Sequence, residues 1–432
     1  MSRPQSVAAL ARDLQSVTDV PGWVLASSST VVAIATGRPE DFGPRGRWVK
    51  RALWPLGPSF AGQVLLQVIG TLAATFWWVR GVLGRRLVSD CPTILLGFGA
   101  GPEAHILAEL EREGPVQHLN HTNPQSLAGI VLPSLSSLWV RTGTEARAVA
   151  RAIRSSQASA IRDNGRLWMV SAALRLGEYV FALAWAEALP ARIHRIVLIS
   201  SSVHAFALVR AAETSGRQVE YRQHGLHKAS IVFPAYPRVL AINSLEATHV
   251  RQRLPRATVN FRSPTQLPRI RRRGKTVLLA APYDCAGFRK ADYVDEVRRL
   301  ARWSENAGMT LTVRPHPTDG SAFWRRELPE LALDESPGGL GVTLERLAPS
   351  LVVGWWSTSL LDALARGILP VLIMPGSAAS IADMVCPLAN VAMNWPDEAM
   401  HISRVLADDE SYLAEVESRQ KLAFGSAQVE GG

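Results

Sequence analysis

Cysteine is scarce in this chain. Its 432 residues include three, Cys91, Cys285 and Cys386, which lie far apart and form no Cys-x-x-Cys pair. An odd number at such spacing indicates neither a disulfide framework nor a zinc site. Charged residues are also few, at 19 % against 47 % hydrophobic residues. This composition excludes a largely disordered chain and predicts two sizeable hydrophobic cores, with extensive burial or membrane contact.

A secretion signal is missing as well. The first residues, MSRPQSVAALARDLQ, carry charges where a signal peptide needs an apolar core. We therefore expect a cytoplasmic protein, either free or peripheral on the inner face of the cytoplasmic membrane. The net charge of +10 favours anionic partners such as nucleotide-sugars and phospholipid head groups. Nucleic acid is not expected, because the basic run 271–275 lacks aromatic residues and falls in a predicted linker.

One segment, 52–79, contains no charged residue and is long enough to cross a bilayer. Tryptophans stand at both ends of it, and prolines interrupt its start. Polar side chains recur every four residues and would form a stripe on one helical face: Gln63, Gln67, Thr71 and Thr75. The segment can therefore be a helix in the membrane interface, a core helix of the first domain, or a membrane span.

From Thr93 onward, short apolar runs alternate with amphipathic segments, a pattern typical of parallel sheets with crossover helices. The apolar runs of the first half are TILLGFG, RIVLISSS, QVEYR and RVLAIN. An Arg- and Pro-rich stretch, 262–273, interrupts the alternation, and we place a domain boundary there. The second half resumes it with KTVLLAAP, TLTVRPHP, LVVGWW and ILPVLIM.

The expected fold class is α/β, with two Rossmann-like doubly wound domains in series. We expect an N-terminal extension with the apolar helix over 1–90. An acceptor-side domain follows over 91–265, and a nucleotide-sugar-binding domain with C-terminal helices over 266–432. Ligands of such sheets bind at the carboxyl ends of the strands, so the two domains are expected to face an interdomain cleft.

Hydroxyl and basic side chains follow two strands of the second half. Ser357, Thr358 and Ser359 are expected in the first turn of a helix, where free N–H groups attract anions. Arg314 and His316 follow the strand TLTV, and the neighbouring prolines enforce an extended path. A guanidinium and an imidazole suit a diphosphate or phosphodiester. The alternatives are an ordinary helix cap and a structural hydrogen-bonding histidine.

A second imidazole site follows the strand QVEYR, where Gln223, a candidate acceptor contact, and His224 lead into a turn at Gly225. His224 can accept a proton from an acceptor hydroxyl near neutral pH, and Lys228 is a candidate contact for the leaving phosphate. A turn histidine bonded to backbone is the alternative for His224, and Lys228 can equally be a solvent-exposed cation.

Other side chains at strand ends complete the expected site. Ser201, Ser202 and His204 stand at a strand-to-helix junction and are candidate acceptor contacts, with ordinary helix capping as the favoured alternative for this junction. Glu103 follows a glycine-rich loop and is an alternative catalytic base. No paired metal carboxylates or His cluster stand at a strand end, so we expect a site without metal or cofactor.

Together these motifs resemble those of a superfamily of inverting GT-B transferases of bacterial surface polysaccharides. It includes HP-motif sialyltransferases, capsular Kdo transferases and CDP-glycerol glycerophosphotransferases. The resemblance spans roughly residues 190–375. It implies the GT-B fold, a CMP or CDP donor whose phosphate is held by His316 with the serine motif 357–359, and His224 as base. The acidic motif of the sialyltransferases is absent.

The function expected is metal-independent, inverting transfer of a sugar from a nucleotide-activated, CMP-linked donor to a surface glycan or lipid-linked acceptor. Three alternatives stay open at this point. They are glycerophosphotransfer from a CDP-glycerol donor, isomerisation of the kind catalysed by UDP-sugar 2-epimerases, and a non-catalytic role in polysaccharide assembly.

Overall fold

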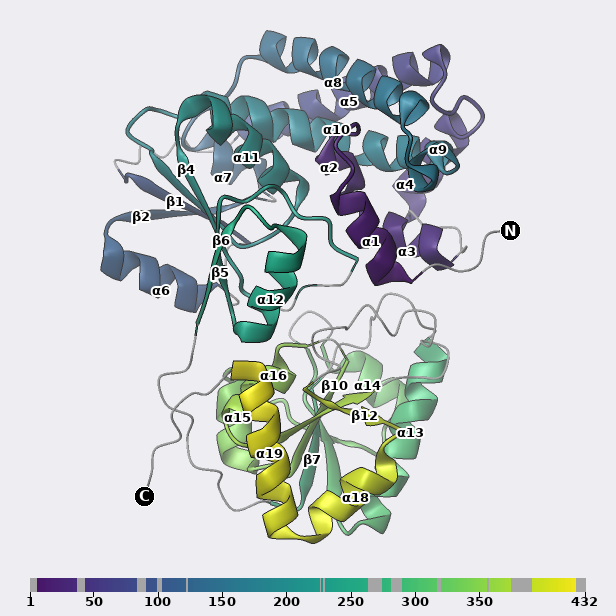
Figure 1. Ribbon diagram of the computed structural model, residues 1–432, viewed down its shortest axis with the longest axis vertical. Helices are drawn as coiled ribbons and strands as arrows, with labels where there is room; N and C mark the ends of the chain where they lie inside the picture. The colour runs from purple at the N-terminus through teal and green to yellow at the C-terminus, as the bar shows by residue number, and fades with distance from the viewer. Residues whose placement is uncertain are drawn as a thin grey trace. The chain divides into compact units, whose positions relative to one another are not determined.

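The computed structural model describes most of the chain in two compact units (Figure 1). The described residues are 6–36, 43–83, 91–98, 103–121, 123–225, 227, 230–262, 274–280, 290–316, 320–355, 357–373 and 391–424. By their contacts, the first unit comprises 1–224, 229–241 and 250–260, and the second comprises 225–228, 242–249 and 261–432. Each unit is built around one six-stranded sheet.

The sheet of the first unit has the strand order β2-β1-β3-β4-β5-β6, and its assigned pairs are parallel. Its strands are β1 (Thr93–Gly97), β2 (Val116–Asn120), β3 (Arg195–Leu198), β4 (Gln218–Arg222), β5 (Arg238–Ala241) and β6 (Thr258–Phe261). The chain runs from β1 outward to β2 and then returns to the other side of β1. The strand order therefore reverses between β1 and β3, which is the usual ligand position in a doubly wound sheet.

Apolar runs determine where these strands and their crossover helices lie. All five residues of β1 are buried, as expected for a strand covered on both faces. The helix α6 (Ala104–Glu113) packs Ile106 and Leu110 against Leu95, Val197 and Ile199. The helix α11 (Val203–Ser215) follows β3 and ends at Gly216, whose left-handed φ of 67° suits glycine.

A layer of helices packs on this sheet through α11. Its members are α1 (Val7–Gln15), α2 (Gly22–Leu25), α3 (Ser28–Thr36), α4 (Gly43–Leu53), α5 (Phe60–Val82), α7 (Pro124–Ala128), α8 (Leu135–Ser155), α9 (Ser159–Arg162) and α10 (Gly165–Glu187). The central helix, α10, is apolar on all sides and packs against α5, α8 and α11 (Figure 1). The run 23–35 is rich in β-branched residues and by composition predicts a strand; this prediction is wrong, because α2 and α3 are helices that pack on α10.

The second unit has a parallel sheet in the order β12-β11-β10-β7-β8-β9. Its strands are β7 (Thr276–Leu279), β8 (Thr310–Val313), β9 (Ala332–Leu333), β10 (Leu351–Gly354), β11 (Leu369–Ile373) and β12 (Met393–Trp395). With β7 as the first strand, this is the Rossmann order 3-2-1-4-5-6. The order reverses between β7 and β10, so the loops after these two strands border the usual nucleotide position.

Helices flank both faces of this second sheet (Figure 1). They are α13 (Lys290–Asn306), α14 (Ala322–Glu327), α15 (Leu340–Leu347), α16 (Ser359–Ala365), α18 (Ala399–Ala407) and α19 (Asp409–Phe424). The remaining helix, α12 (Ser244–Arg253), lies between β5 and β6 in the chain. The last helix is fastened to the sheet by Tyr412, whose hydroxyl donates to the carbonyl of Ser350 and accepts from the amide of Leu369. The predicted α/β class with two parallel sheets in series is thus confirmed.

Candidate functional site

Aromatic and imidazole rings gather at the carboxyl ends of the first sheet. Phe98 follows β1, His121 follows β2, His204 lies in the first turn of α11 after β3, and His224 follows β4. The ring centroids of Phe98 are 4.9 Å from His121 and 5.4 Å from His224, and those of His121 and His204 are 5.2 Å apart. We call these four residues the ring cluster. It lies beside the point where the strand order reverses.

His224 is held in one tautomer when it is neutral. Its Nδ1 is 2.6 Å from the carbonyl oxygen of Ile199. A carbonyl only accepts hydrogen bonds, so Nδ1 carries the proton and Nε2 keeps its lone pair. The side chain is half-buried, and the ring of Phe98 packs against it. Nε2 therefore has the electronic form that a general base requires.

The next imidazole of the same turn differs. His227 is 3 % exposed, and its Nδ1 lies 2.6 Å from the carboxylate of Glu246, which is fully buried. That pairing gives His227 a structural environment, and it belongs with Glu246 to the second unit. Of the two histidines, His224 is therefore the better candidate for proton transfer.

His121 is a neutral neighbour of this site. Its Nδ1 donates to the carbonyl oxygen of Gly97 over 2.7 Å. Burial and the charge of His204 lower the pKa of His121 to about 4, although the Gly97 carbonyl and the carboxylates of Glu178 and Glu103 act in the opposite direction. At pH 7 the His121 ring is therefore neutral and adds no positive charge to the ring cluster.

His204 has a buried partner that the sequence did not reveal. Its Nδ1 is 2.9 Å from a carboxylate oxygen of Glu178 on α10, and Trp77 of α5 packs on its ring at 5.5 Å. Burial alone would raise the pKa of Glu178, but the charge and hydrogen bond of His204 outweigh it and lower that pKa. Because His204 is 2 % exposed, its assignment as a direct acceptor contact is wrong.

Glu103 also differs from the expectation. Its side chain is fully buried, and its Oε1 lies 3.2 Å from Nε2 of His118 on β2. A Cβ atom on Gly97 would come within 2.4 Å of that carboxylate, so Gly97 provides the space that Glu103 occupies. A carboxylate packed beneath a strand cannot reach an acceptor hydroxyl, and we therefore correct its role from catalytic base to structural partner of His118.

One hydroxyl after β3 remains a candidate for acceptor binding. Ser201 and Ser202 are both half-buried residues at the start of α11, but the hydroxyl oxygen of Ser201 is itself buried, which leaves Ser202. Ser202 occupies the N-cap position without making a side-chain capping bond, so the ordinary capping interpretation does not account for its hydroxyl. Gln223 is completely buried, and its backbone amide bonds to Leu240. A direct contact between the Gln223 side chain and an acceptor is therefore wrong.

The second unit presents hydroxyls where its strand order reverses. The helix α16 begins at Ser359, one to two residues later than expected, and Thr358 is its N-cap. Ser359 is buried, and its Oγ lies 3.0 Å from the carbonyl of Ala280 after β7 and 2.7 Å from Oγ of Ser357. This hydroxyl links the two strands that border the reversal, which leaves Ser357 and Thr358, both half-buried, as the candidates for phosphate.

His316 stands at the same edge of this sheet. It follows β8, while Ser357 follows β10, and β7 lies between those two strands. Neighbouring strands are spaced about 4.8 Å apart, so the two strand ends are roughly 10 Å apart. The His316 side chain is exposed. A phosphate at the reversal lies within reach of side chains from both strand ends.

Arg314 is directed elsewhere. Its guanidinium donates to the carbonyls of Ser336 and Gly338, each over 2.6 Å, and to Asp334. Burial would raise the pKa of Asp334, but hydrogen bonds from Ser336 and Thr343 and the charge of Arg314 lower it to about 2. Arg314 therefore orders the loop between β9 and α15, and we correct its expected role as a phosphate ligand.

Two further expectations concern Lys228 and the metal. Lys228 lies outside the described residues. Within the described ranges, no group of three or more His, Cys, Asp or Glu side chains is arranged to hold a metal ion. Catalysis without metal stays a prediction.

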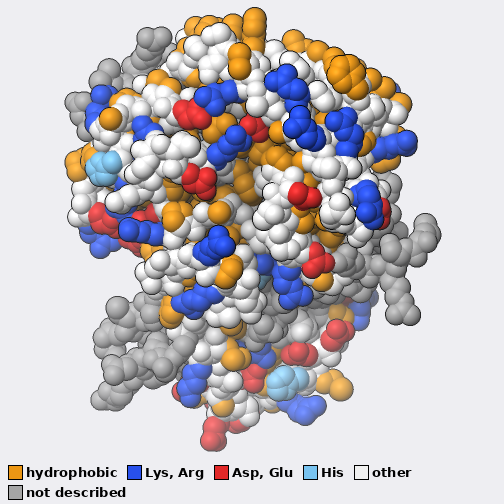
Figure 2. All heavy atoms as spheres, turned by 45° about the horizontal axis from the view of Figure 1, so that its top comes forward, with side chains coloured by type: hydrophobic (Ala, Val, Ile, Leu, Met, Phe, Trp, Pro, Cys, Tyr) orange, Lys and Arg blue, Asp and Glu red, His pale blue; other side chains and the backbone are white. Residues whose placement is uncertain are grey.

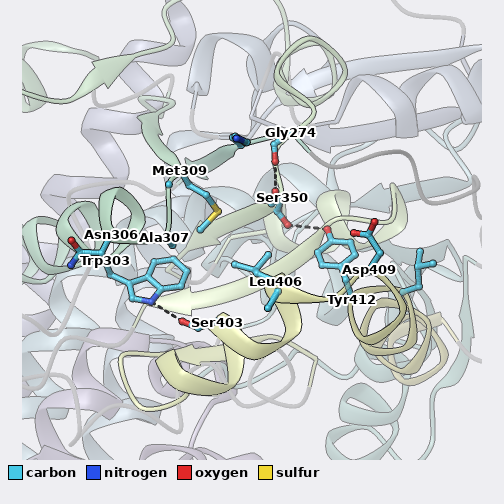
Figure 3. A pocket seen from close by; sticks show the side chains of 14 residues that line it. Gly274, Trp303, Asn306, Ala307, Met309, Ser350, Ser403, Leu406, Asp409 and Tyr412 are labelled. Atoms are coloured by element: carbon cyan, nitrogen blue, oxygen red, sulfur yellow. Dashed lines mark hydrogen bonds between the residues drawn. The ribbon is translucent and has the colours of Figure 1, made fainter.

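A hollow of the second unit lies at the opposite end of its strands (Figure 3). It measures about 1140 Å³ and is bordered by Lys275, Met309 and Ser350, which precede β7, β8 and β10. Two pairs of its polar side chains and backbone groups are bonded to each other, as the Trp303–Ser403 and Tyr412–Ser350 hydrogen bonds show. Ligands of doubly wound sheets bind at the carboxyl ends, so we do not assign the nucleotide to this hollow.

Sequence reasoning missed His121 and Glu178. One signal for Glu178 was present, because it interrupts the apolar centre of a 23-residue helix, where an acidic side chain needs a partner. His121 follows a strand with few apolar residues, VQHLN, and a strand of that composition escapes a search for hydrophobic runs.

No family model and no curated protein sequence matches the chain. Among solved structures, UDP-GlcNAc 2-epimerase from Neisseria meningitidis bound to UDP-GlcNAc matches at 13 % identity over 75 % of this chain and 94 % of its own, with a TM-score of 0.43. MurG from Acinetobacter baumannii matches at 10 % identity over 77 % and 95 %, with a TM-score of 0.44. UGT2 from Phytolacca americana, complexed with UDP-2-fluoro-glucose and pterostilbene, matches at 11 % identity over 77 % and 94 %, with a TM-score of 0.41. Similarity at this level carries no functional conclusion for this chain.

Proposed function

We propose that this chain is a metal-independent, inverting glycosyltransferase with a nucleotide-activated sugar as donor. The observation that carries the proposal is the fixed tautomer of His224, in which Nδ1 carries the proton and Nε2 the lone pair, at a strand end of the first unit. The Rossmann strand order of the second unit, with hydroxyls where that order reverses, supports a nucleotide site there.

The proposed reaction is a single displacement. His224 Nε2 takes the proton of an acceptor hydroxyl while the acceptor oxygen forms a bond to the anomeric carbon of the sugar. The bond between that carbon and the donor phosphate oxygen breaks, and its electron pair leaves with the nucleotide. Ser357, Thr358 and His316 are proposed to stabilise the charge that develops on the phosphate.

The finer identity of the substrates rests on motif resemblance. His316 with Pro317, and Ser357 with Thr358 and Ser359, resemble the HP and serine motifs that hold CMP- or CDP-linked donors. On that basis we propose a CMP-linked sugar as the donor and a surface glycan or a lipid-linked saccharide as the acceptor. Glycerophosphotransfer from CDP-glycerol would use the same phosphate-binding side chains, but the bond that breaks would be the one between the two phosphates of the donor.

A nucleotide screen followed by product analysis tests the proposal. The thermal unfolding temperature of the full chain is measured with CMP, CDP, UDP and GDP, because a ligand that binds the native state raises it. The corresponding activated sugars are then incubated with and without saccharide acceptors. We expect stabilisation by a cytidine nucleotide, and a glycosidic product only when an acceptor is present.

Other results would overturn parts of the proposal. Conversion of the sugar without any acceptor would identify an isomerase. Release of a glycerophosphate-modified acceptor from CDP-glycerol would identify a glycerophosphotransferase. Nucleotide binding without turnover on any acceptor would indicate a non-catalytic assembly protein.

A further inference from the structure

The helix α5 has two faces that differ in their surroundings. Its inner face packs on α10 and α8, where Gly70 and Gly177 allow close approach: a Cβ on Gly70 would lie 2.4 Å from Leu176, and one on Gly177 the same distance from Ala73. The polar stripe noted in the sequence faces α8, since Trp139 donates to Thr75 over 3.1 Å. Because protein covers this inner face, the span interpretation is not favoured, and the core-helix interpretation accounts for only half of the helix.

The outer face of α5 is exposed and apolar. Among the described residues, two helices are long and apolar enough to cross a membrane, α5 and α10. In an apolar window of 18 residues, 28 % of α5 is buried, against 83 % of α10. Exposed fractions run from 44 % at Val64 to 73 % at Phe60. These large side chains recur every four residues: Phe60, Val64, Val68, Leu72 and Phe76. Soluble proteins rarely leave such a continuous apolar stripe uncovered unless it binds something.

Cations surround this stripe. On α8, Arg147, Arg151 and Arg154 recur at a spacing that places them on one face, and Arg154 donates to the carbonyl of Pro58 just before α5. Arg80 lies over the ring of Phe76 at the other end. A hollow of about 590 Å³ near the start of α5 is lined by Lys50, Arg166 and Arg162, and Arg162 pairs there with Asp163.

Acidic side chains are nearly absent from the same helices. Neither α4 nor α5 contains Asp or Glu. The single acid of α8, Glu145, is 4 % exposed and bonded to Arg210. Figure 2, which brings the top of Figure 1 forward, shows hydrophobic side chains and many Lys and Arg side chains on this part of the first unit, with some Asp and Glu side chains among them.

We propose that the outer face of α5 and the cations around it form a docking surface for an anionic lipid bilayer. The helix lies in the plane of the interface, with its apolar side chains among the acyl chains and the arginines at the phosphate level. Charge complementarity selects this occupant over a second copy of the chain, because two such faces would bring arginines against arginines. The inference is independent of the transferase reaction.

Vesicle co-sedimentation of the full chain tests this surface. Vesicles of phosphatidylcholine alone are compared with vesicles that contain 30 mol % phosphatidylglycerol, roughly the anionic content at which a polybasic surface responds. Leu72→Glu/Phe76→Glu is expected to weaken binding to the anionic vesicles by about tenfold or more. Arg147→Gln/Arg151→Gln is expected to weaken it by about 25-fold, with little change on neutral vesicles, and added salt should act in the same direction.

Matched controls lie in the second unit. Val342→Glu/Met400→Glu adds the same charges at exposed apolar positions and is expected to leave vesicle binding unchanged. All substituted side chains are exposed, so thermal unfolding should stay near wild type. Undiminished vesicle binding by Leu72→Glu/Phe76→Glu would overturn the proposal. So would a lipid-free dimer, seen by light scattering, that this variant dissociates, because the face would then bind a second copy.

Discussion

The imidazole of His224 and the carbonyl of Ile199 are joined by a hydrogen bond of 2.6 Å. Ile199 follows β3 and His224 follows β4, so the bond links the ends of two neighbouring strands. Since the carbonyl can only accept, the bond orients the ring and determines which nitrogen is basic. A catalytic role for His224 depends on this backbone contact as much as on the imidazole itself.

Replacement of His224 by Ala should therefore lower turnover by about 10²- to 10⁴-fold, the usual contribution of a positioned general base. The affinity for the donor nucleotide should stay unchanged, because the variant removes no phosphate contact. Steady-state kinetics with calorimetric titration of the nucleotide check both quantities. His194→Ala, at an exposed histidine of the same unit, is the control and should keep full turnover. Equal turnover in the two variants would rule out His224 as the base.

Ser357 offers a test of the phosphate site. Ser357→Ala removes a half-buried hydroxyl next to the reversal of strand order, and donor affinity should fall by about tenfold, as expected for one hydrogen bond to a charged group. Ser411→Ala removes an exposed hydroxyl from α19 and should have no effect. An unchanged dissociation constant for Ser357→Ala would move the nucleotide away from this end of the sheet.

Arg314 should matter for stability instead of donor binding. Arg314→Met removes one of the two guanidinium partners of buried Asp334, the other being Arg346, and also removes two bonds to loop carbonyls. The free energy of unfolding should fall by about 2–3 kcal/mol in urea titrations. Arg404→Met, at an exposed arginine of α18, should change it by less than about 0.5 kcal/mol. Loss of donor binding with unchanged stability would restore the phosphate role.

His121 should make the free energy of unfolding depend on pH. Its pKa is about 4 in the folded chain, against 6.5 for an unperturbed histidine, so below pH 6.5 the unfolded chain binds a proton that the folded chain does not. The stabilisation is fully present above pH 6.5 and is lost as pH falls towards 4, by roughly 3 kcal/mol. His121→Asn should flatten this part of the stability profile measured by denaturant unfolding. A slope identical to wild type would show that His121 is not the group responsible.

The strands were predictable because each is a short apolar run that ends at polar or turn residues. TILLG, RIVL and LVVG became β1, β3 and β10 at nearly their expected positions. The strand β2 was not predicted, because a half-exposed strand at the edge of a sheet needs few apolar side chains. The run at 23–35 was misassigned because β-branched residues also fit a helix that is buried against other helices.

The candidate site was predictable only where position along the chain was enough. His224, His316 and Ser357 follow strands, and parallel strands bring such residues to one edge of their sheet. Side-chain direction was not predictable. The partner of Arg314 is Asp334, 20 residues further on, and that of His204 is Glu178 on a helix before β3. Neither pairing has a sequence spacing that would identify it.

The hydroxyl of Tyr412 has a consequence for how the protein is made. It forms hydrogen bonds with the backbone of Ser350 and Leu369. These two residues precede Tyr412 by some 40 to 60 residues and leave the ribosome well before α19. The first unit has all of its residues within the first 260 and can pack while synthesis continues. In the second unit, the carbonyl of Ser350 and the amide of Leu369 instead lack their hydrogen-bond partner until α19 has been synthesised.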